Sequence, residues 1–247
     1  MIYKIKLALY QIKQWLRSIY IYPKFNFQGQ DYDKYWQSRN LDSITALNEF
    51  QKKRVEFTLS YIEKDSVFMD FGSGSGSVLA YINKEKPMKE LIGVDISEYA
   101  LNLAKEKGIK TFKKDLTNIE NLRELPAADY ISLFEVLEHV PSSEDLLRWA
   151  VERAQKGVFF SVPNTGFFTH RLRLLFGKFP LQWRRNPSEH LRFWTVRDMK
   201  WLMLQLGYNS YKLHLYKGVP LFRSLLPSLF AEGIFIYVPC GKSLPKS

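Results

Sequence analysis

The sequence predicts an α/β fold with a doubly wound, seven-stranded and mostly parallel sheet that carries helices on both faces. Three observations lead to it: short apolar runs alternate with helical patterns, the first run ends in a glycine-rich turn, and later runs end in carboxylates. Continuous apolar runs, without polar alternation, are typical of parallel strands buried on both faces. An N-terminal helical extension and an inserted basic segment are expected in addition.

The chain order of the elements follows from these runs and from the capping residues between them. Strands are expected at 67–71, 91–95, 109–112, 129–134, 157–162, 211–216 and 233–238. Ser97, Ser142 and Thr195 are typical first residues of helices, because their side chains accept orphan backbone N–H bonds. Gly108 ends the first of these helices, and the second is expected to continue to about Gln155.

A glycine-rich turn follows the first strand, where residues 70–77 have the sequence D-F-G-S-G-S-G-S. Glycines at such a turn let the backbone bend into a helix and approach a ligand without interference from Cβ. The spacing differs from the G-x-G-x-x-G pattern of dinucleotide sites, and the chain lacks a G-x-x-x-x-G-K-[ST] phosphate loop. The turn therefore indicates a nucleotide-like ligand and a weak phosphate site.

Acidic residues follow the next three strands. Asp95 lies 21 residues after Gly74, where a carboxylate is placed to accept both hydroxyls of a ribose. Asp115 is placed to meet an adenine amino group, and Glu135 ends the fourth strand. This pattern fits an adenosine without phosphates.

Four segments resemble class I S-adenosylmethionine (SAM)-dependent methyltransferases in order and spacing: D-F-G-S-G-S-G, G-V-D-I-S, K-D-L and F-E-V-L-E-H-V. The resemblance covers residues 31–240, and S-V-P-N, H-R-L and H-L-R-F-W-T at 161–164, 170–172 and 190–195 are similar to the MetW/UbiG-like branch. It implies SAM as cofactor and, in related enzymes, a lid segment across the cofactor. The cofactor-binding residues that it implies are Tyr35, Arg39, Asp70, Gly72, Ser73, Gly74, Gly76, Asp95, Ile96, Asp115, Leu116, Phe134 and Glu135.

The E-x-x-E-H motif at 135–139 is the expected centre of the chemistry. Methyl transfer is a single in-line displacement, and a hydroxyl acceptor must also lose a proton. His139, His190 and Glu135 are the candidate catalytic residues, since imidazole titrates near neutral pH. Glu135, Glu138, His139 and His190 together also resemble the metal site of small-RNA-end 2′-O-methyltransferases and of some UbiG-like quinone O-methyltransferases, which implies Mg²⁺ or Mn²⁺. The same motif occurs in methyltransferases that use no metal, so both interpretations stay open.

Two segments carry nearly all of the net charge of +11. Residues 1–40 have seven Lys or Arg against two Asp, and residues 163–194 have six against one Glu. The 163–194 segment follows the fifth strand, at the end of the sheet where ligands bind, and is longer than an ordinary connection. Its positive field favours an anionic acceptor. The expected acceptor-binding residues are Arg171, Trp183, Arg184 and Arg185.

Residues 1–40 are expected to form an amphipathic helix and a lid segment, ahead of a methyltransferase domain over 41–247. An apolar stripe at helical spacing is formed by Ile2, Ile5, Leu9, Ile12, Leu16 and Ile19. Lys and Arg lie beside this stripe. It can pack on the domain, on a second subunit as a homodimer contact, or on a membrane surface.

Three functions fit these features. The preferred one is O-methylation of an anionic small molecule, phosphorylated or nucleotide-linked, for example in surface-glycan biosynthesis, because the acid and histidine set is intact. The alternatives are RNA 2′-O-methylation and a non-catalytic, MetW-like role beside a partner in methionine biosynthesis. The single cysteine, Cys240, excludes an intramolecular disulfide and favours a reducing cytoplasm, with peripheral membrane contact left open. No apolar run has the length of a membrane-spanning helix.

Overall fold

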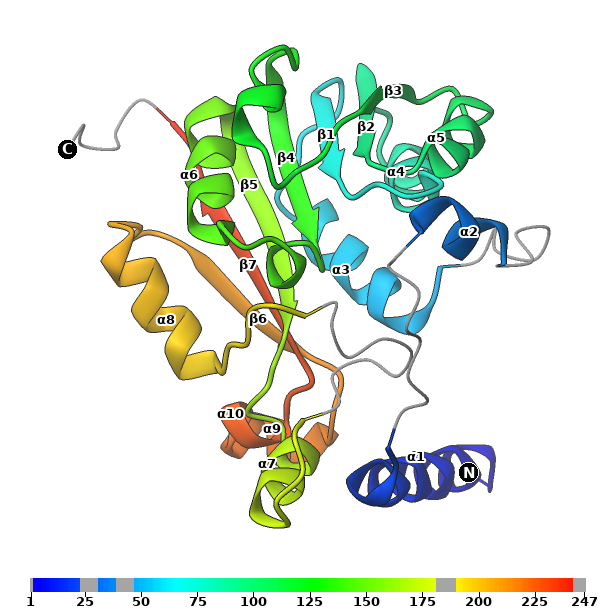
Figure 1. Cartoon of the computed structure of the whole chain (residues 1–247), viewed down its shortest axis with the longest axis vertical. Helices are drawn as coiled ribbons and strands as arrows, with labels where there is room; N and C mark the ends of the chain where they lie inside the picture. Colours follow the sequence, from blue (N-terminus) through cyan, green and yellow to red (C-terminus); the bar gives the residue numbers. More distant parts are fainter. Residues whose placement is uncertain (1, 23–30, 39–46, 181–189, 242–247) are drawn as a thin grey trace.

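A seven-stranded sheet dominates the computed structural model, which describes residues 2–22, 31–38, 47–180 and 190–241 (Figure 1). The strands are β1 (Val67–Phe71), β2 (Glu90–Asp95), β3 (Lys110–Lys113), β4 (Ala128–Phe134), β5 (Ala154–Pro163), β6 (Lys212–Tyr216) and β7 (Gly233–Pro239). Their order in space is β3-β2-β1-β4-β5-β7-β6. β7 is antiparallel to β5 and β6, and the other pairs are parallel. The predicted fold class is confirmed.

Helices cover both faces of the sheet, as a doubly wound fold requires. One face packs against α3 (Glu49–Leu59), α4 (Ser77–Glu85) and α5 (Glu98–Lys105), and the other against α6 (Ser143–Arg153) and α8 (Val196–Gln205). Successive side chains of a strand point to opposite faces, so Phe68 joins the first core and Met69 the second. The carboxyl ends of the parallel strands lie together at one end of the sheet, and the candidate site is built from the loops that follow them.

Two of the three predicted helix caps are confirmed. The side chains of Ser97 and Thr195 each accept a hydrogen bond from the backbone N–H three residues on. The side chain of Ser142 makes no capping hydrogen bond. The helix, predicted to run to about Gln155, ends at Arg153, where Ala154 begins to pair with β4.

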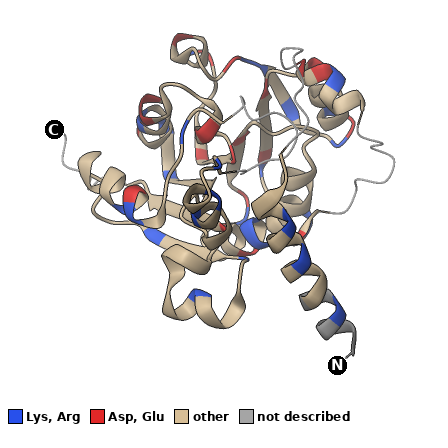
Figure 2. Cartoon of the chain, turned by 60° about the horizontal axis from the view of Figure 1, so that its bottom comes forward, with Lys and Arg blue, Asp and Glu red and all other residues tan. Residues whose placement is uncertain are grey.

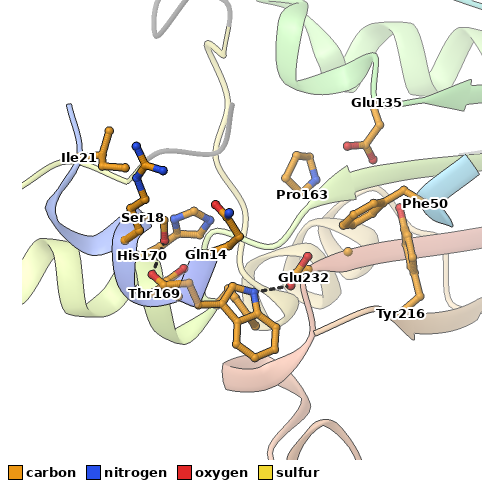
Figure 3. Close-up of a pocket in the computed structure, with 14 residues that line it drawn as sticks. Gln14, Ser18, Ile21, Phe50, Glu135, Pro163, Thr169, His170, Tyr216 and Glu232 are labelled. Atoms are coloured by element: carbon orange, nitrogen blue, oxygen red, sulfur yellow. Dashed lines mark hydrogen bonds between the residues drawn. The ribbon is translucent and has the colours of Figure 1, made fainter. Parts of the chain in front are cut away.

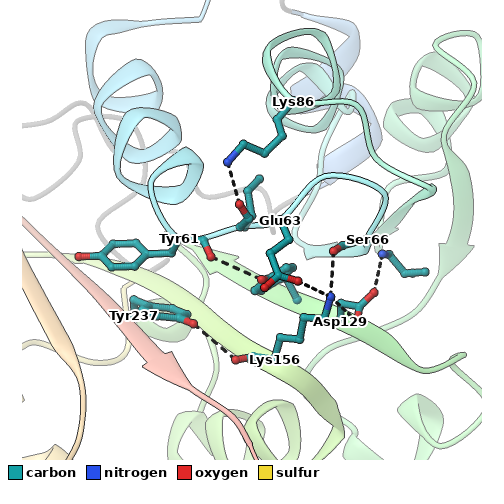
Figure 4. Close-up of polar contacts among 10 residues, drawn as sticks. Tyr61, Glu63, Ser66, Lys86, Asp129, Lys156 and Tyr237 are labelled. Atoms are coloured by element: carbon teal, nitrogen blue, oxygen red, sulfur yellow. Dashed lines mark hydrogen bonds and ion pairs between the residues drawn. The ribbon is translucent and has the colours of Figure 1, made fainter.

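The amino-terminal starts of three strands are tied together at the edge opposite the site (Figure 4). Lys156 Nζ donates to Glu63 Oε2 at 2.7 Å and lies 3.4 Å from Asp129 Oδ1. Asp129 Oδ2 in turn accepts from the backbone N–H of Val67 at 2.8 Å. These bonds hold β1, β4 and β5 in register, which aligns their carboxyl ends at the other edge.

The N-terminal helix α1 (Ile2–Tyr20) docks on the domain beside α7 (Phe168–Leu175), at the lower end of the view in Figure 1. The buried guanidinium of Arg173 donates to the carbonyl oxygens of Ser18, Ile19 and Ile21 at 2.7, 3.1 and 2.8 Å. Carbonyls at a helix C-terminus have no partner within the helix, so Arg173 satisfies them. None of the described helices is long and apolar enough to cross a membrane.

Candidate functional site

A cavity of about 370 Å³ lies at the carboxyl ends of β1, β2, β3 and β4, within the size range of small-ligand sites. Predicted cofactor residues contribute much of its wall: Tyr35, Gly72, Asp95, Ile96, Asp115, Leu116 and Glu135. Residues that sequence reasoning did not place there also line it: Tyr32, Lys114, Thr117, Val136 and Val140. We call it the cofactor cavity.

The glycine-rich turn is held against the end of β2. Gly74 N donates to Asp95 Oδ2 at 2.8 Å, and Ser97 N donates to Asp95 Oδ1 at 2.9 Å. Burial raises the pKa of Asp95, and these backbone donors oppose that rise. Gly74 has a φ of +52°, and a Cβ there would lie 2.3 Å from a ring carbon of Trp36. Glycine is therefore required at this position by both the backbone conformation and the covering ring.

The short helix α2 (Tyr32–Gln37) covers the cofactor cavity, to which it contributes Tyr32, Tyr35 and Trp36. Asp33 seats this lid on the N-terminus of α5. Its Oδ1 accepts from Ser97 Oγ at 2.5 Å and from Tyr99 N at 3.1 Å, and these bonds lower the pKa of Asp33. Helix N-termini attract carboxylates, which makes this a physically favoured latch.

Replacing Asp33 by Ala is expected to weaken SAM binding by roughly three- to tenfold, because the lid loses two charge-assisted bonds that are partly screened by water. Calorimetric titration with SAM measures the change. Glu106→Ala is the matched control, since Glu106 is an exposed acid at the other end of α5. Equal affinities in the two variants would show that Asp33 does not hold the lid.

Several predicted cofactor residues do not line the cofactor cavity: Asp70, Ser73, Gly74, Gly76 and Phe134. Trp36 covers Gly74. Asp70 points into the sheet, where Ser132 Oγ donates to its Oδ1 at 2.6 Å and burial raises its pKa to about 7. The Phe134 ring packs on Phe235, on the face that β4 turns toward α3. The predicted Arg39 lies outside the described residues.

A second cavity, of about 570 Å³, lies between α1, α7 and the adjoining ends of β5 and β7 (Figure 3). Aromatic rings and polar groups share its lining: Gln14, Trp15, Arg17, Ser18, Ile21, Phe50, Glu135, Pro163, Phe167, Thr169, His170, Tyr216, Glu232 and Gly233. Trp15 Nε1 donates to Glu232 Oε1 at 3.0 Å and so ties α1 to the start of β7. We call it the acceptor cavity, and Glu135 lines both cavities.

Glu135 is fixed at the end of β4 by partners that sequence reasoning missed. Its Oε1 accepts from Ser161 Oγ at 2.8 Å and lies 3.2 Å from Nη1 of the buried Arg54. The backbone of Glu135 has a φ of +56°, a conformation that non-glycine residues rarely adopt and that often marks functional sites. Arg54 belongs to α3, and no motif in the sequence distinguishes it from the Lys and Arg residues that lie on the protein surface.

Glu138, His139 and His190 form a compact cluster, with one potential ligand atom of each within 4.8 Å of the others. Backbone bonds from Leu191 N and Arg192 N to Glu138 O bring the two segments together. Glu135, the predicted fourth member of a metal set, is absent from this cluster because Arg54 and Ser161 hold its carboxylate elsewhere. The described residues therefore bring together three of the four predicted ligands.

Burial controls the ionisation of this cluster. Glu138 is 1% exposed, its pKa is raised well above the ordinary value by burial and by Glu135, and its carboxylate oxygens have no hydrogen-bond partner among the described residues. Burial, followed by the charges of His139 and His170, lowers the pKa of His190 to about 3. His190 is therefore neutral and weakly basic at pH 7, unlike the base that the sequence predicts.

The arginines of the basic segment that the structure describes bind backbone rather than a cavity. Arg171 Nε donates to Gly166 O at 2.6 Å, and Arg171 does not line the acceptor cavity. Arg173 anchors α1 and Arg192 donates to Pro141 O. The predicted acceptor residues Trp183, Arg184 and Arg185 lie outside the described residues.

The fold and the cavity at the carboxyl strand ends define a class I SAM-dependent methyltransferase, as the sequence predicts. A family model described as a methyltransferase domain matches residues 43–213, and the chain belongs to this family. No curated protein matches the chain. The MetW/UbiG-like branch is not confirmed by these comparisons.

Solved structures of methyltransferases share the fold. A SAM-dependent methyltransferase from Archaeoglobus fulgidus is 18% identical, covers 84% of this chain and 100% of its own, and has a TM-score of 0.58. The small RNA methyltransferase HEN1 is 25% identical over 81% of this chain and 26% of its own, with a TM-score of 0.58. The plantazolicin methyltransferase BpumL, in complex with SAH, is 17% identical over 87% of this chain and 92% of its own, with a TM-score of 0.58.

Proposed function

We propose that the protein transfers a methyl group from SAM, bound in the cofactor cavity, to a hydroxyl of an anionic small molecule bound in the acceptor cavity. The observation that carries this proposal is that Glu135 lines both cavities. An in-line displacement needs the donor methyl and the acceptor atom to meet at one point. The shared wall at Glu135 is where ligands in the two cavities come together.

The residues around that wall suit proton removal from an alcohol. The Glu135 carboxylate is oriented by Arg54 and Ser161 and is placed to accept a hydrogen bond from the acceptor hydroxyl. His139 lines the cofactor cavity and lies beside His190, with ring centroids 4.8 Å apart. His139 is therefore the better candidate for the base, and His190 orients it as a neutral neighbour.

An anionic acceptor is supported by the field around the acceptor cavity. Arg17 lines the cavity and is exposed, whereas burial lowers the pKa of His170 to about 4 and leaves it neutral. Residues 1–30, 163–188 and 199–231 contain no Asp or Glu. Glu135 and Glu232 also line the cavity, but Arg54 lies 3.2 Å from the Glu135 carboxylate and Trp15 donates to Glu232. The helices α1 and α7 that wall the cavity add cations and no acids, and these cations support an anionic acceptor.

The test is a turnover screen with SAM against nucleotide sugars, sugar phosphates and RNA, followed by two matched variants. Phe50→Ala, in the acceptor cavity, is expected to raise the acceptor KM and leave SAM affinity unchanged. Ile96→Ala, in the cofactor cavity, is expected to weaken SAM binding and leave the acceptor KM unchanged. Both side chains are partly exposed, so neither change should unfold the domain. The cavity assignment fails if Phe50→Ala alters SAM affinity and not the acceptor KM.

RNA 2′-O-methylation is a second candidate, favoured by the 25% identity to HEN1 and by the Glu138, His139 and His190 cluster. A buried carboxylate without a hydrogen-bond partner and two imidazoles fit a divalent ion such as Mn²⁺. These three residues would hold it, and it would supply a lowered pKa for a bound alcohol. Turnover of RNA, and not of small anions, would select this candidate.

A further inference from the structure

We propose that the end of the molecule formed by α1, α7 and α9 (Pro220–Leu225) docks on the surface of an anionic lipid bilayer. Exposed apolar side chains gather on these helices and on the residues that directly follow them, and we call them the basal surface: Leu9, Tyr10, Ile12, Leu16, Tyr20 and Tyr22; Leu174, Leu175, Phe176 and Phe179; and Leu221, Phe222, Leu225 and Leu226. Large exposed apolar patches mark sites of association.

Only part of the predicted apolar stripe of α1 packs against the domain. Ile19 is buried, but Leu9 and Leu16 are 60% and 55% exposed. Trp15, which lies beside the stripe, makes the docking contacts instead, with the rings of Phe167 and Phe168 at 5.8 and 5.6 Å. The outward part of the stripe therefore remains available to a partner.

Ring contacts join the three helices into one surface. Tyr20 at the end of α1 lies 6.3 Å from Phe176 after α7, and Lys178 Nζ lies over the rings of Tyr20 and Tyr22 at 5.4 and 5.0 Å. From Phe168 the contacts continue to Phe230 of α10 (Pro227–Phe230) and on to Phe222 of α9, at 5.7 and 5.1 Å. Helices that are far apart in sequence are thus held at one end of the molecule.

The charges on this end fit a membrane of anionic lipids. Lys6, Lys13 and Arg17 are exposed on α1, and Figure 2 shows blue stretches of ribbon, which mark Lys and Arg, along this helix. The described segments that supply the basal surface, 2–22, 168–180 and 220–226, contain no Asp or Glu. Leucine and aromatic side chains flanked by Lys and Arg are typical of helices that lie in a bilayer interface.

The composition of the basal surface also argues against a second copy of this chain and against RNA as its partner. In a two-fold dimer the basal surface would meet its own copy, so cations would face cations with no carboxylate from these helices to pair with them. RNA is bound by cations and aromatic rings, and exposed Leu and Ile side chains add nothing to that. A bilayer uses both the cations and the aliphatic side chains.

The test is flotation of the full chain with vesicles of phosphatidylcholine, alone or mixed with phosphatidylglycerol. We expect binding to the mixed vesicles, weaker binding to phosphatidylcholine alone, and loss of binding as salt is raised. Leu9→Gln with Leu16→Gln is expected to lower vesicle affinity roughly tenfold or more. Leu204→Gln is the matched control, because this leucine is 61% exposed on α8, outside the basal surface.

Absence of flotation with either vesicle overturns the proposal, as does equal flotation of the double variant and the control. A dimer or an RNA complex that the double variant loses, without flotation of the parent chain, assigns the surface to that partner instead. Circular dichroism checks the fold, and Leu221→Gln with Leu225→Gln repeats the test on α9. Vesicle binding needs neither SAM nor an acceptor, so its outcome is independent of the proposed methyl transfer.

Discussion

Asp95→Ala is expected to weaken SAM binding by about 10- to 100-fold, since charge-assisted hydrogen bonds contribute roughly 1.5–3 kcal/mol. Asp95 lies at the end of β2 and lines the cofactor cavity. Its carboxylate also accepts from Gly74 N and Ser97 N, so the variant loses the ribose acceptor and the bonds that shape the glycine turn. Isothermal titration with SAM measures the loss.

Two companion variants separate the contributions of Asp95. Glu98→Ala removes an exposed carboxylate three residues on, outside the cavity, and is expected to leave SAM affinity unchanged. Asp95→Asn keeps one side-chain oxygen and the shape but loses the charge. Its SAM affinity is expected to lie between those of Asp95→Ala and Glu98→Ala. SAM affinity of a folded Asp95→Ala protein equal to that of the parent would refute the assignment of this residue.

His139→Gln is expected to lower kcat by about 10²- to 10⁴-fold, the usual contribution of a general base, with SAM affinity changed little. His139 lies in the wall of the cofactor cavity, which Glu135 also lines. The measurement is steady-state turnover with the acceptor that the screen returns. His214→Gln is the control, because His214 stacks on Phe57 and lines neither cavity.

A chelator and Glu138→Gln then decide whether the cluster holds a metal. Burial and the neighbouring Glu135 raise the pKa of Glu138, which favours the neutral carboxyl, so without a bound cation Gln should substitute for it with small loss. We expect turnover that resists the chelator and a tolerated Gln. Loss of turnover with the chelator, recovery with Mn²⁺ and an inactive Glu138→Gln would instead establish the ion, and with it favour RNA as the acceptor.

The sequence alone was enough to predict the sheet, because each strand is signalled locally. Apolar runs of strand length and the glycines after β1 are local patterns, and they predicted the strand positions to within three residues. The spacing from Gly74 to Asp95 predicted a ribose acceptor at the carboxyl end of β2, and Asp95 does line the cofactor cavity there. Its hydrogen bond from Gly74 N was not predicted. The capping by Ser97 and Thr195 was predictable, because a cap acts over three residues.

Side-chain direction was beyond the sequence. Asp70 and Phe134 were predicted to bind the cofactor, yet Asp70 accepts a hydrogen bond from Ser132 inside the sheet and the Phe134 ring packs on Phe235. Both contacts come from other strands, so local sequence does not reveal them. Glu135 was predicted as a metal ligand, but a cation from a helix far away in the chain, Arg54, takes its carboxylate. Such a pairing leaves no trace in local spacing.

The sequence by itself determined the fold class, the end of the sheet at which the cofactor cavity lies and the concentration of positive charge in two segments. Only the tertiary structure decided how those segments are used. In the structure, Arg173 donates to the backbone carbonyls at the end of α1, α1 and α7 wall the acceptor cavity, and Leu9 and Leu16 stay exposed. The physical reason is that a strand or a cap is fixed by neighbours in sequence, whereas burial, and the partner that a charge finds, depend on which distant helices pack beside it.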